Sequence, residues 1–126
     1  NPSSISQAAA VEALNGNQGF IQKRSKAFKE RRDFVVKSLN NIKGINCLTP
    51  NGAFYVFPSC KGLLSKKNKL KTDTDFVQKL LEKSNVAVVQ GSAFGLDGYF
   101  RISYATSMQN LKKAMDRIKS FCESLS

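Results

Sequence analysis

The chain has 126 residues, a length typical of one domain, and its 41% apolar and 23% charged residues indicate a packed protein, not a disordered one. Lysine and arginine outnumber aspartate and glutamate by 20 to 9, which gives a net charge of +11, and the sequence contains no histidine. This composition excludes a histidine-ligated metal site and a histidine general base within the chain, and it makes nucleic-acid binding the first alternative function to consider.

The cysteines and the apolar pattern indicate the compartment. Cys47, Cys60 and Cys122 are widely spaced and form no CxxC pair, which is typical of small buried thiols in a reducing cytosol; a reactive thiol is the alternative. We therefore expect a cytoplasmic protein. Apolar runs fall short of the ~20 residues that cross a bilayer, so no membrane partner is expected. The first four residues lack the basic start of a signal peptide and an initiator methionine, so we expect the chain to begin inside a longer gene product.

The first predicted elements are two helices. An alanine-rich helix is expected over residues 3–14, and the Asn-Gly-Asn sequence at residues 15–17 ends it. A second helix is expected over residues 18–42, because apolar side chains recur along one face while basic side chains cover the other. Its length of about 37 Å equals the width of a small domain. A helix this long in a short chain typically joins two bodies.

The rest of the chain alternates strands and helices. Gly44 is expected to be the left-handed cap of the long helix, and further helices are expected to begin near Thr72 and Ser107. Strands are expected over residues 45–48, 53–57, 86–89 and 99–104. This order predicts an α+β fold, in which a small antiparallel or mixed sheet has helices packed on one side and is preceded by the long helix. Residues 1–17 have no obvious packing partner within the chain.

Arg101 is the strongest single candidate for a functional residue. Alternation along the strand over residues 99–104 directs Phe100, Ile102 and Tyr104 toward the core and Arg101 toward the opposite face. The arginine then either lies on a solvated outer face or points into a cleft, where its planar fork can hold a carboxylate or phosphate through two parallel hydrogen bonds. The pattern alone leaves both alternatives open and favours the solvated face.

Three further features have a functional and a structural interpretation. The Gln-Gly-Ser-Ala-Phe-Gly segment at residues 90–95 could cradle a phosphate, but it matches no phosphate-loop spacing and is interpreted as a flexible connection. Lys26 and Lys66 each follow a serine, but both lie in polar surroundings that do not activate an amine. The lysines between Lys61 and Lys71 could grip a phosphate backbone or could simply be solvated.

Several motifs, taken in chain order, resemble class I aminotransferases, which are pyridoxal-phosphate enzymes of fold type I. The match is best to the bacterial aspartate aminotransferase branch. The motifs are NPSSISQ with its following alanines at the start, PNGAFYVF at residues 50–57, VAVVQGSAFG at residues 86–95 and GYFRISYA at residues 98–105. Each motif is moderately specific alone, whereas the four motifs in register are strongly specific. Together they cover the whole chain. One departure is Gln90, where the family usually has proline.

The resemblance implies a division of the chain and a role for two residues. Residues 1–17 would be the tail of the large cofactor-binding domain, residues 18–43 the interdomain helix, and residues 44–126 the C-terminal small domain. Arg101 would bind the substrate α-carboxylate, which an amino acid and its 2-oxo acid share. Asn1 would lie near the active site of the neighbouring subunit in a homodimer. The expected partners are therefore the amino acid and 2-oxo acid, with aspartate favoured, and the rest of the aminotransferase chain.

The resemblance also implies what this chain lacks. The family's Schiff-base lysine lies upstream, in a Ser-Lys motif followed by G-x-R-x-G, and neither Lys26 nor Lys66 fits that pattern. Most pyridoxal-phosphate ligands would lie upstream too, so we assign no catalytic, cofactor-binding or metal-binding residue to this chain. We predict that the full-length enzyme transfers amino groups and that the 126-residue chain alone does not.

Two other classes of function compete with this interpretation. A small basic RNA- or DNA-binding α+β module would explain the charge, but it should expose aromatic side chains on its sheet for base stacking. Tyr99 could serve, whereas Phe54 and Phe100 are expected in the core. An interaction domain without a small-molecule site is the third alternative. Since the excess charge falls on one helix face and one loop, away from the motifs, we do not expect nucleic acid to be a partner.

Overall fold

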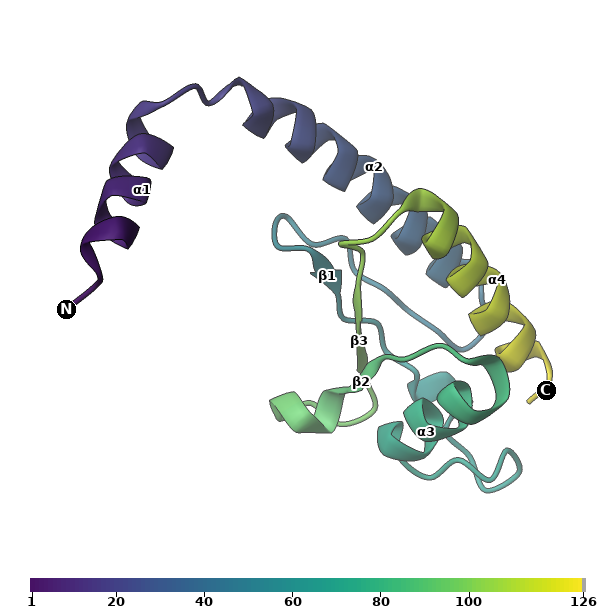
Figure 1. The fold of residues 1–126 in the computed structure, drawn as a ribbon. Coiled ribbons are helices and arrows are strands. Elements are labelled where there is room, and N and C mark those ends of the chain that lie inside the picture. Colours follow the sequence, from purple (N-terminus) through teal and green to yellow (C-terminus); the bar gives the residue numbers. More distant parts are fainter. Residues whose placement is uncertain (126) are drawn as a thin grey trace.

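The computed structural model describes residues 1–125, and Figure 1 shows their arrangement. Within these residues the α-helices are α1 (Ser4–Asn15), α2 (Gly19–Asn40), α3 (Asp73–Ser84) and α4 (Met108–Glu123). The strands are β1 (Tyr55–Val56), β2 (Val89–Gln90) and β3 (Phe100–Ser103), and two 3-10 helices are η1 (Lys61–Leu63) and η2 (Gly91–Phe94). The α+β class predicted from the sequence is confirmed.

Helices α3 and α4 begin where the sequence places capping residues. Thr72 accepts a hydrogen bond from the backbone N–H of Asp75, whose carboxylate bonds back to the N–H of Thr72, so α3 starts with a complete capping box. Ser107 caps α4 by a single bond, which its side chain accepts from the backbone N–H of Asn110. The cap predicted at Gly44 for the long helix is wrong, because α2 ends at Asn40, and Asn41, at φ −83°, is its cap. Gly44 does adopt the left-handed conformation, at φ +90°, in the turn that follows.

The sheet is antiparallel with strand order β1-β3-β2, so β3 is central (Figure 1). The strand predicted at residues 45–48 is wrong, because only Asn46 makes an isolated bridge, to Ser59. The Asn40 side chain instead takes both backbone groups of Cys47, accepting from its N–H at 2.8 Å and donating to its carbonyl at 2.9 Å. The strand predicted at residues 53–57 shortens to Tyr55–Val56, since Ala53 lies at φ +65°, outside strand conformation.

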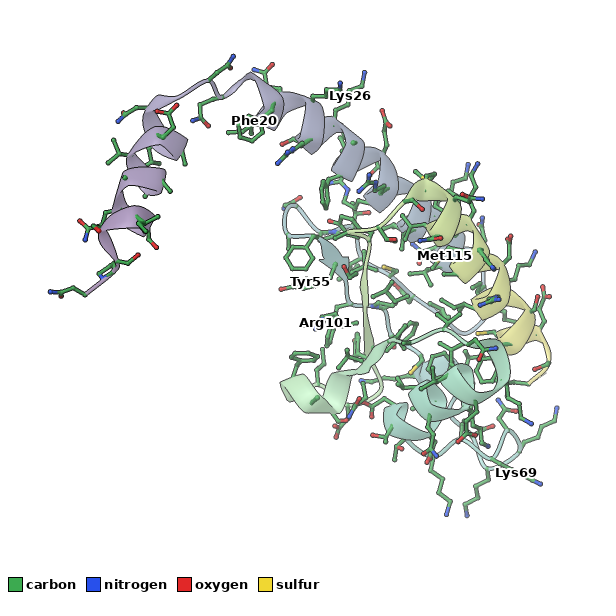
Figure 2. All side chains as sticks on the ribbon, viewed as in Figure 1. Phe20, Lys26, Tyr55, Lys69, Arg101 and Met115 are labelled. Atoms are coloured by element: carbon green, nitrogen blue, oxygen red, sulfur yellow. The ribbon has the colours of Figure 1, made fainter. Side chains whose placement is uncertain are left out.

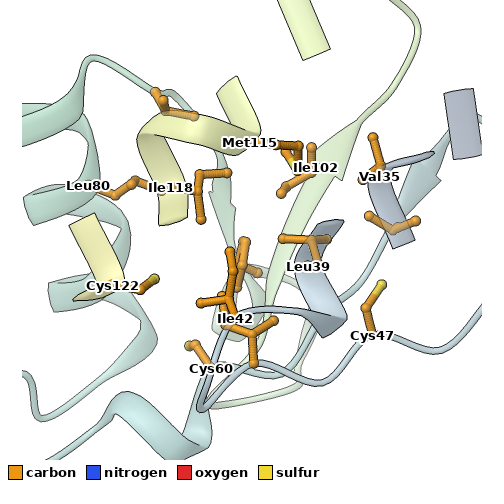
Figure 3. Close-up of a cluster of buried hydrophobic side chains, with 14 of the residues drawn as sticks. Val35, Leu39, Ile42, Cys47, Cys60, Leu80, Ile102, Met115, Ile118 and Cys122 are labelled. Carbon is orange, nitrogen blue, oxygen red and sulfur yellow. The ribbon is translucent and has the colours of Figure 1, made fainter. Parts of the chain in front are cut away.

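The core lies on one face of the sheet, between β3 and the helices α2, α3 and α4 (Figure 3). Phe76 of α3 is fully buried, with its ring centroid 5.0 Å from that of Phe100 and 5.7 Å from that of Phe121. The C-terminal half of α2 adds Val35 and Leu39, both fully buried. The helices thus pack on one side of the sheet, as predicted, and leave the other face for the side chains that alternate outward.

The first part of the chain stands apart from this core. All residues of α1 are exposed, and Figure 1 shows α1 projecting away from the sheet at the far end of α2. Phe20 and Ile21, at the start of α2, remain 50% and 46% exposed, whereas Val35 on the same helix is fully buried. The apolar face of α2 therefore meets the core only in its second half. This arrangement is consistent with the predicted boundaries at residues 17 and 43, which stay predictions.

Candidate anion-binding site on the outer face of the sheet

The site is built around Arg101 at the centre of β3. Phe100 and Ile102 on either side of it are buried, with 0% and 7% of their surface exposed, and they anchor the strand to the core. Arg101 pairs with Val89 of β2, while Ile102 pairs with Val56 of β1, so both neighbouring strands fix the backbone at this point. Its side chain accordingly leaves the sheet on the outer face, opposite to α4 and Met115 (Figure 2).

Two aromatic rings flank the Arg101 guanidinium. Its central carbon lies 4.5 Å from the ring centroid of Phe94 in η2 and 5.4 Å from that of Tyr55 in β1. Within residues 1–125, no carboxylate comes within the 4.0 Å of an ion pair with this guanidinium. Because rings attract a cation over their faces, the planar N–H fork at the edge of the guanidinium stays available to an external anion.

The η2 segment is anchored, although the sequence suggested a flexible connection. The buried Asp73 carboxylate, 3% exposed, accepts a hydrogen bond of 2.7 Å from the backbone N–H of Ser92. The N–H of Gly91 donates to the Tyr99 carbonyl at 2.7 Å, and a side chain at Gly91 would collide with the Leu96 carbonyl. The glycine is therefore required by close backbone packing. These contacts fix the turn that carries Phe94 against Arg101.

Asp73 is a residue whose role the sequence did not reveal. It is one of two acids in the first turn of α3, and the other, Asp75, completes the capping box. Burial disfavours the Asp73 carboxylate, yet hydrogen bonds from Ser92, and from the backbone of Asp73 and Gly98, outweigh burial and lower its pKa. The sequence signal for this role is that the first turn of α3 contains a second acid, Asp73, besides the Asp75 that the capping box requires.

Replacing the buried Asp73 by asparagine removes the charge from the hydrogen bond that ties Ser92 of η2 to α3. We expect Asp73→Asn to lower the free energy of unfolding at pH 7 by about 1.5–3 kcal/mol. Folding lowers the pKa of Asp73 from 3.8. The stability that its carboxylate contributes is therefore fully present above pH 3.8, and it is lost as the pH falls through the lower pKa of the folded protein. Urea unfolding followed by circular dichroism measures the free energy of unfolding at pH 7 and at pH 3. The difference in unfolding free energy between wild type and Asp73→Asn should be smaller at pH 3.

A matched control uses Asp97, an exposed aspartate in the loop that precedes β3. Asp97→Asn should leave the urea midpoint unchanged at both pH values. If Asp73→Asn matched this control at pH 7, the carboxylate would not anchor η2.

The other predicted site residues lie away from Arg101. Asn1 is exposed at the free end of α1, which Figure 1 marks as the N-terminus, so this chain does not bring it to the guanidinium. Lys26 is exposed on the outer side of α2, as Figure 2 shows, and Lys66 is exposed in the lysine-rich loop of residues 61–71. In that loop, Lys61 places its ammonium nitrogen 5.0 Å from the ring centroid of Tyr99.

The cysteines are buried and unpaired within the described residues, as predicted. Burial raises the pKa of Cys47 to about 11 and the pKa values of Cys60 and Cys122 to about 12. These thiols stay protonated near neutral pH, so the structure argues against the alternative of a reactive thiol. Residues 1–125 contain no group of three side chains that could hold a metal ion, and no helix among them is long and apolar enough to cross a membrane.

The outer face carries more aromatic rings than the sequence suggested, but they pack against one another. Phe57 stacks on Tyr99 at 5.9 Å between centroids with an angle of 17°, and it meets Phe94 edge to face at 5.9 Å. The expectation that Phe54 lies in the core is wrong, because 53% of its surface is exposed. Phe100 is fully buried, as expected. The rings on this face lie against one another or against the Arg101 and Lys61 side chains.

The fold and the site together define a small α+β domain in which Arg101, without an ion-pair partner among residues 1–125, lies between two aromatic rings. A family description, aminotransferase class I and II, matches residues 1–118, so the chain belongs to the class I and II aminotransferase family. An aspartate aminotransferase of Rhizobium meliloti (strain 1021) is 56% identical over 99% of this chain and 32% of its own length. A probable aspartate/prephenate aminotransferase of Rhizobium leguminosarum bv. phaseoli is 58% identical over 94% of this chain and 31% of its own.

Solved structures agree with this assignment. The crystal structure of the aspartate aminotransferase from Rhizobium meliloti superposes with a TM-score of 0.94 at 55% identity, covering 99% of this chain and 32% of that one. An alanine aminotransferase from Pyrococcus furiosus superposes with a TM-score of 0.90 at 36% identity, covering 98% of this chain and 30% of that one. The resemblance stated from the motifs is thus confirmed. The chain spans about a third of the length of the curated relatives it matches.

Proposed function

We propose that the chain is the C-terminal domain of a pyridoxal-phosphate-dependent aminotransferase, in which Arg101 binds the α-carboxylate of the substrate. The observation that supports this most is the Arg101 guanidinium, which two rings flank and which no carboxylate of residues 1–125 neutralises. An amino acid and its 2-oxo acid share the α-carboxylate and differ at the neighbouring carbon. One bidentate clamp on the carboxylate can therefore orient both compounds in the same way.

The residues of this chain do not by themselves fit pyridoxal phosphate. The cofactor needs a lysine in a dry pocket, and the lysines that follow serines, Lys26 and Lys66, are both exposed. The cofactor supplies an electron sink for reactions at the α-carbon. Its ligands are assigned here to the two-thirds of the relatives' length that this chain does not cover. Within the proposal, the chain contributes substrate binding and orientation only.

The proposed substrates are aspartate and 2-oxoglutarate. Support comes from relatives named aspartate or aspartate/prephenate aminotransferases at up to 58% identity.

We also propose that residues 1–17 end the large domain, that residues 18–43 link it to the small domain of residues 44–126, and that the enzyme is a homodimer. The exposed α1 carries Asn1 away from its own sheet, as a contribution to a neighbouring subunit's site would require. Buried, unpaired thiols support a cytoplasmic location.

The proposed function is tested by comparing the complete protein with the chain of residues 1–126. We expect the complete protein, supplied with pyridoxal phosphate, to transfer the amino group of aspartate to 2-oxoglutarate. The isolated chain should show no transfer and should retain no cofactor absorbance after gel filtration. Turnover by the isolated chain, or none by the complete protein, would contradict the proposal. Salt-dependent binding of an oligonucleotide at physiological ionic strength would instead favour the nucleic-acid alternative.

A further inference from the structure

The aromatic side chains beside Arg101 do little for the core. Phe94 is 49% exposed and Tyr55 is 37% exposed, so neither ring is held by burial alone. Both nevertheless lie against the same guanidinium, at 4.5 Å and 5.4 Å from its carbon. They come from opposite sides of β3, since β1 and the β2–η2 segment flank that strand (Figures 1 and 2). We propose that Phe94 and Tyr55 are positioning residues that hold the Arg101 fork in its carboxylate-binding orientation.

Such positioning matters because a free arginine has many rotamers. Fixing a long side chain on binding costs conformational entropy, and a side chain already held in place avoids that cost. Rings over the faces of a guanidinium restrict its rotation without occupying its N–H groups, which lie in the plane. An acidic partner would hold the arginine too, but it would neutralise the charge that a carboxylate needs. Aromatic contacts therefore suit an arginine that must stay both oriented and available.

The structure gives Phe94 the larger share of this role. Its ring is the closer of the two, and Phe57 supports it edge to face at 5.9 Å. The turn that carries it is tied to α3 through the hydrogen bond from Ser92 to the buried Asp73. Tyr55 is farther away, and its ring meets that of Phe54, which is itself exposed. We therefore expect substitutions at Phe94 to weaken carboxylate binding more than those at Tyr55.

The test uses the complete protein, because this inference rests on the proposed role of Arg101. Phe94→Leu removes the ring and keeps an apolar side chain, whereas Phe94→Tyr keeps the ring and is the matched control. Binding of succinate, a dicarboxylate with no amino group to transfer, is measured by calorimetry, and KM is measured for aspartate and 2-oxoglutarate. We expect Phe94→Leu to weaken succinate binding about tenfold and to raise both KM values equally, while Phe94→Tyr stays within about twofold of wild type.

A double-mutant cycle with Arg101→Ala separates positioning from a general structural effect. If Phe94 acts through Arg101, Phe94→Leu changes neither succinate binding nor kcat/KM further in the Arg101→Ala background. Equal losses in both backgrounds, or no loss from Phe94→Leu in an active enzyme, would overturn the inference. Tyr55→Leu against Tyr55→Phe repeats the test independently, with a loss of about threefold expected for leucine alone. Unchanged succinate binding in Arg101→Ala would instead overturn the proposed role of Arg101.

Discussion

Arg101→Ala in the complete protein is expected to lower kcat/KM for aspartate and for 2-oxoglutarate by a factor of about 10²–10³. Truncating one partner of a desolvated, hydrogen-bonded charge pair costs about 3–4 kcal/mol, and each 1.36 kcal/mol is tenfold in rate. The kcat/KM values of both substrates should fall by the same factor, because the proposed contact of Arg101 is to the carboxylate that they share. Steady-state kinetics of both half-reactions would measure it.

Two controls sharpen the Arg101 prediction. Arg101→Lys keeps the positive charge but loses the planar fork, so its kcat/KM should fall between those of wild type and alanine. Arg117→Ala removes an equal charge from α4, whose arginine donates a hydrogen bond to the Asn85 carbonyl and lies outside the Arg101 site. This variant should keep wild-type kcat/KM. If Arg101→Ala and Arg117→Ala had the same activity, Arg101 would not contact substrate.

Local signals predicted the helices and the face of Arg101. Helix periodicity and capping residues are short-range properties, which explains why α3 and α4 begin directly after Thr72 and Ser107 as expected. The outward position of Arg101 followed from alternation along β3, another local property. Pattern alone could not show whether the arginine was functional. Its aromatic neighbours come from residues 46 positions before it and 7 positions before it, and no local pattern joins them.

Two of the errors came from hydrogen bonds between a polar side chain and the backbone of another segment. The segment at residues 45–48 has strand-like composition, but the Asn40 side chain takes the backbone groups of Cys47 that a strand would have used. The glycine-containing segment at residues 90–95 suggested flexibility, because its sequence does not show that Asp73 reaches Ser92 from 19 positions away. In both places one polar side chain decides the conformation of a separate segment. Such a contact leaves no periodic signal in the sequence.

The same small-domain fold occurs in aminotransferases that are named for different substrates. This chain superposes on an alanine aminotransferase almost as closely as on an aspartate aminotransferase, with TM-scores of 0.90 and 0.94. A shared small domain therefore does not separate the two substrates. An arginine that binds the α-carboxylate would be common to both, since alanine and aspartate both carry that group. The groups that distinguish the substrate side chains are accordingly expected in the part of the enzyme that this chain does not cover.

The largest loss of stability is expected from Phe76→Ala in α3. Phe76 is fully buried and joins α3 to β3 through Phe100 and to α4 through Phe121. Truncating it leaves a cavity among three elements that cannot all collapse inward, so the free energy of unfolding should fall by about 3–5 kcal/mol. Urea unfolding of the chain of residues 1–126, followed by circular dichroism, would show this as a lower midpoint with an unchanged slope.

The matched control for Phe76 is Leu81→Ala on the same helix, where 50% of the side chain is exposed. Its cost should be well below that of Phe76→Ala, because it removes less buried surface and opens no internal cavity. Equal losses for the two variants would mean that α3 does not pack on the sheet through Phe76. The comparison also bears on the proposed site, since Phe100 immediately precedes Arg101 on β3. Packing of α3 against Phe100 holds in place the strand from which the guanidinium projects.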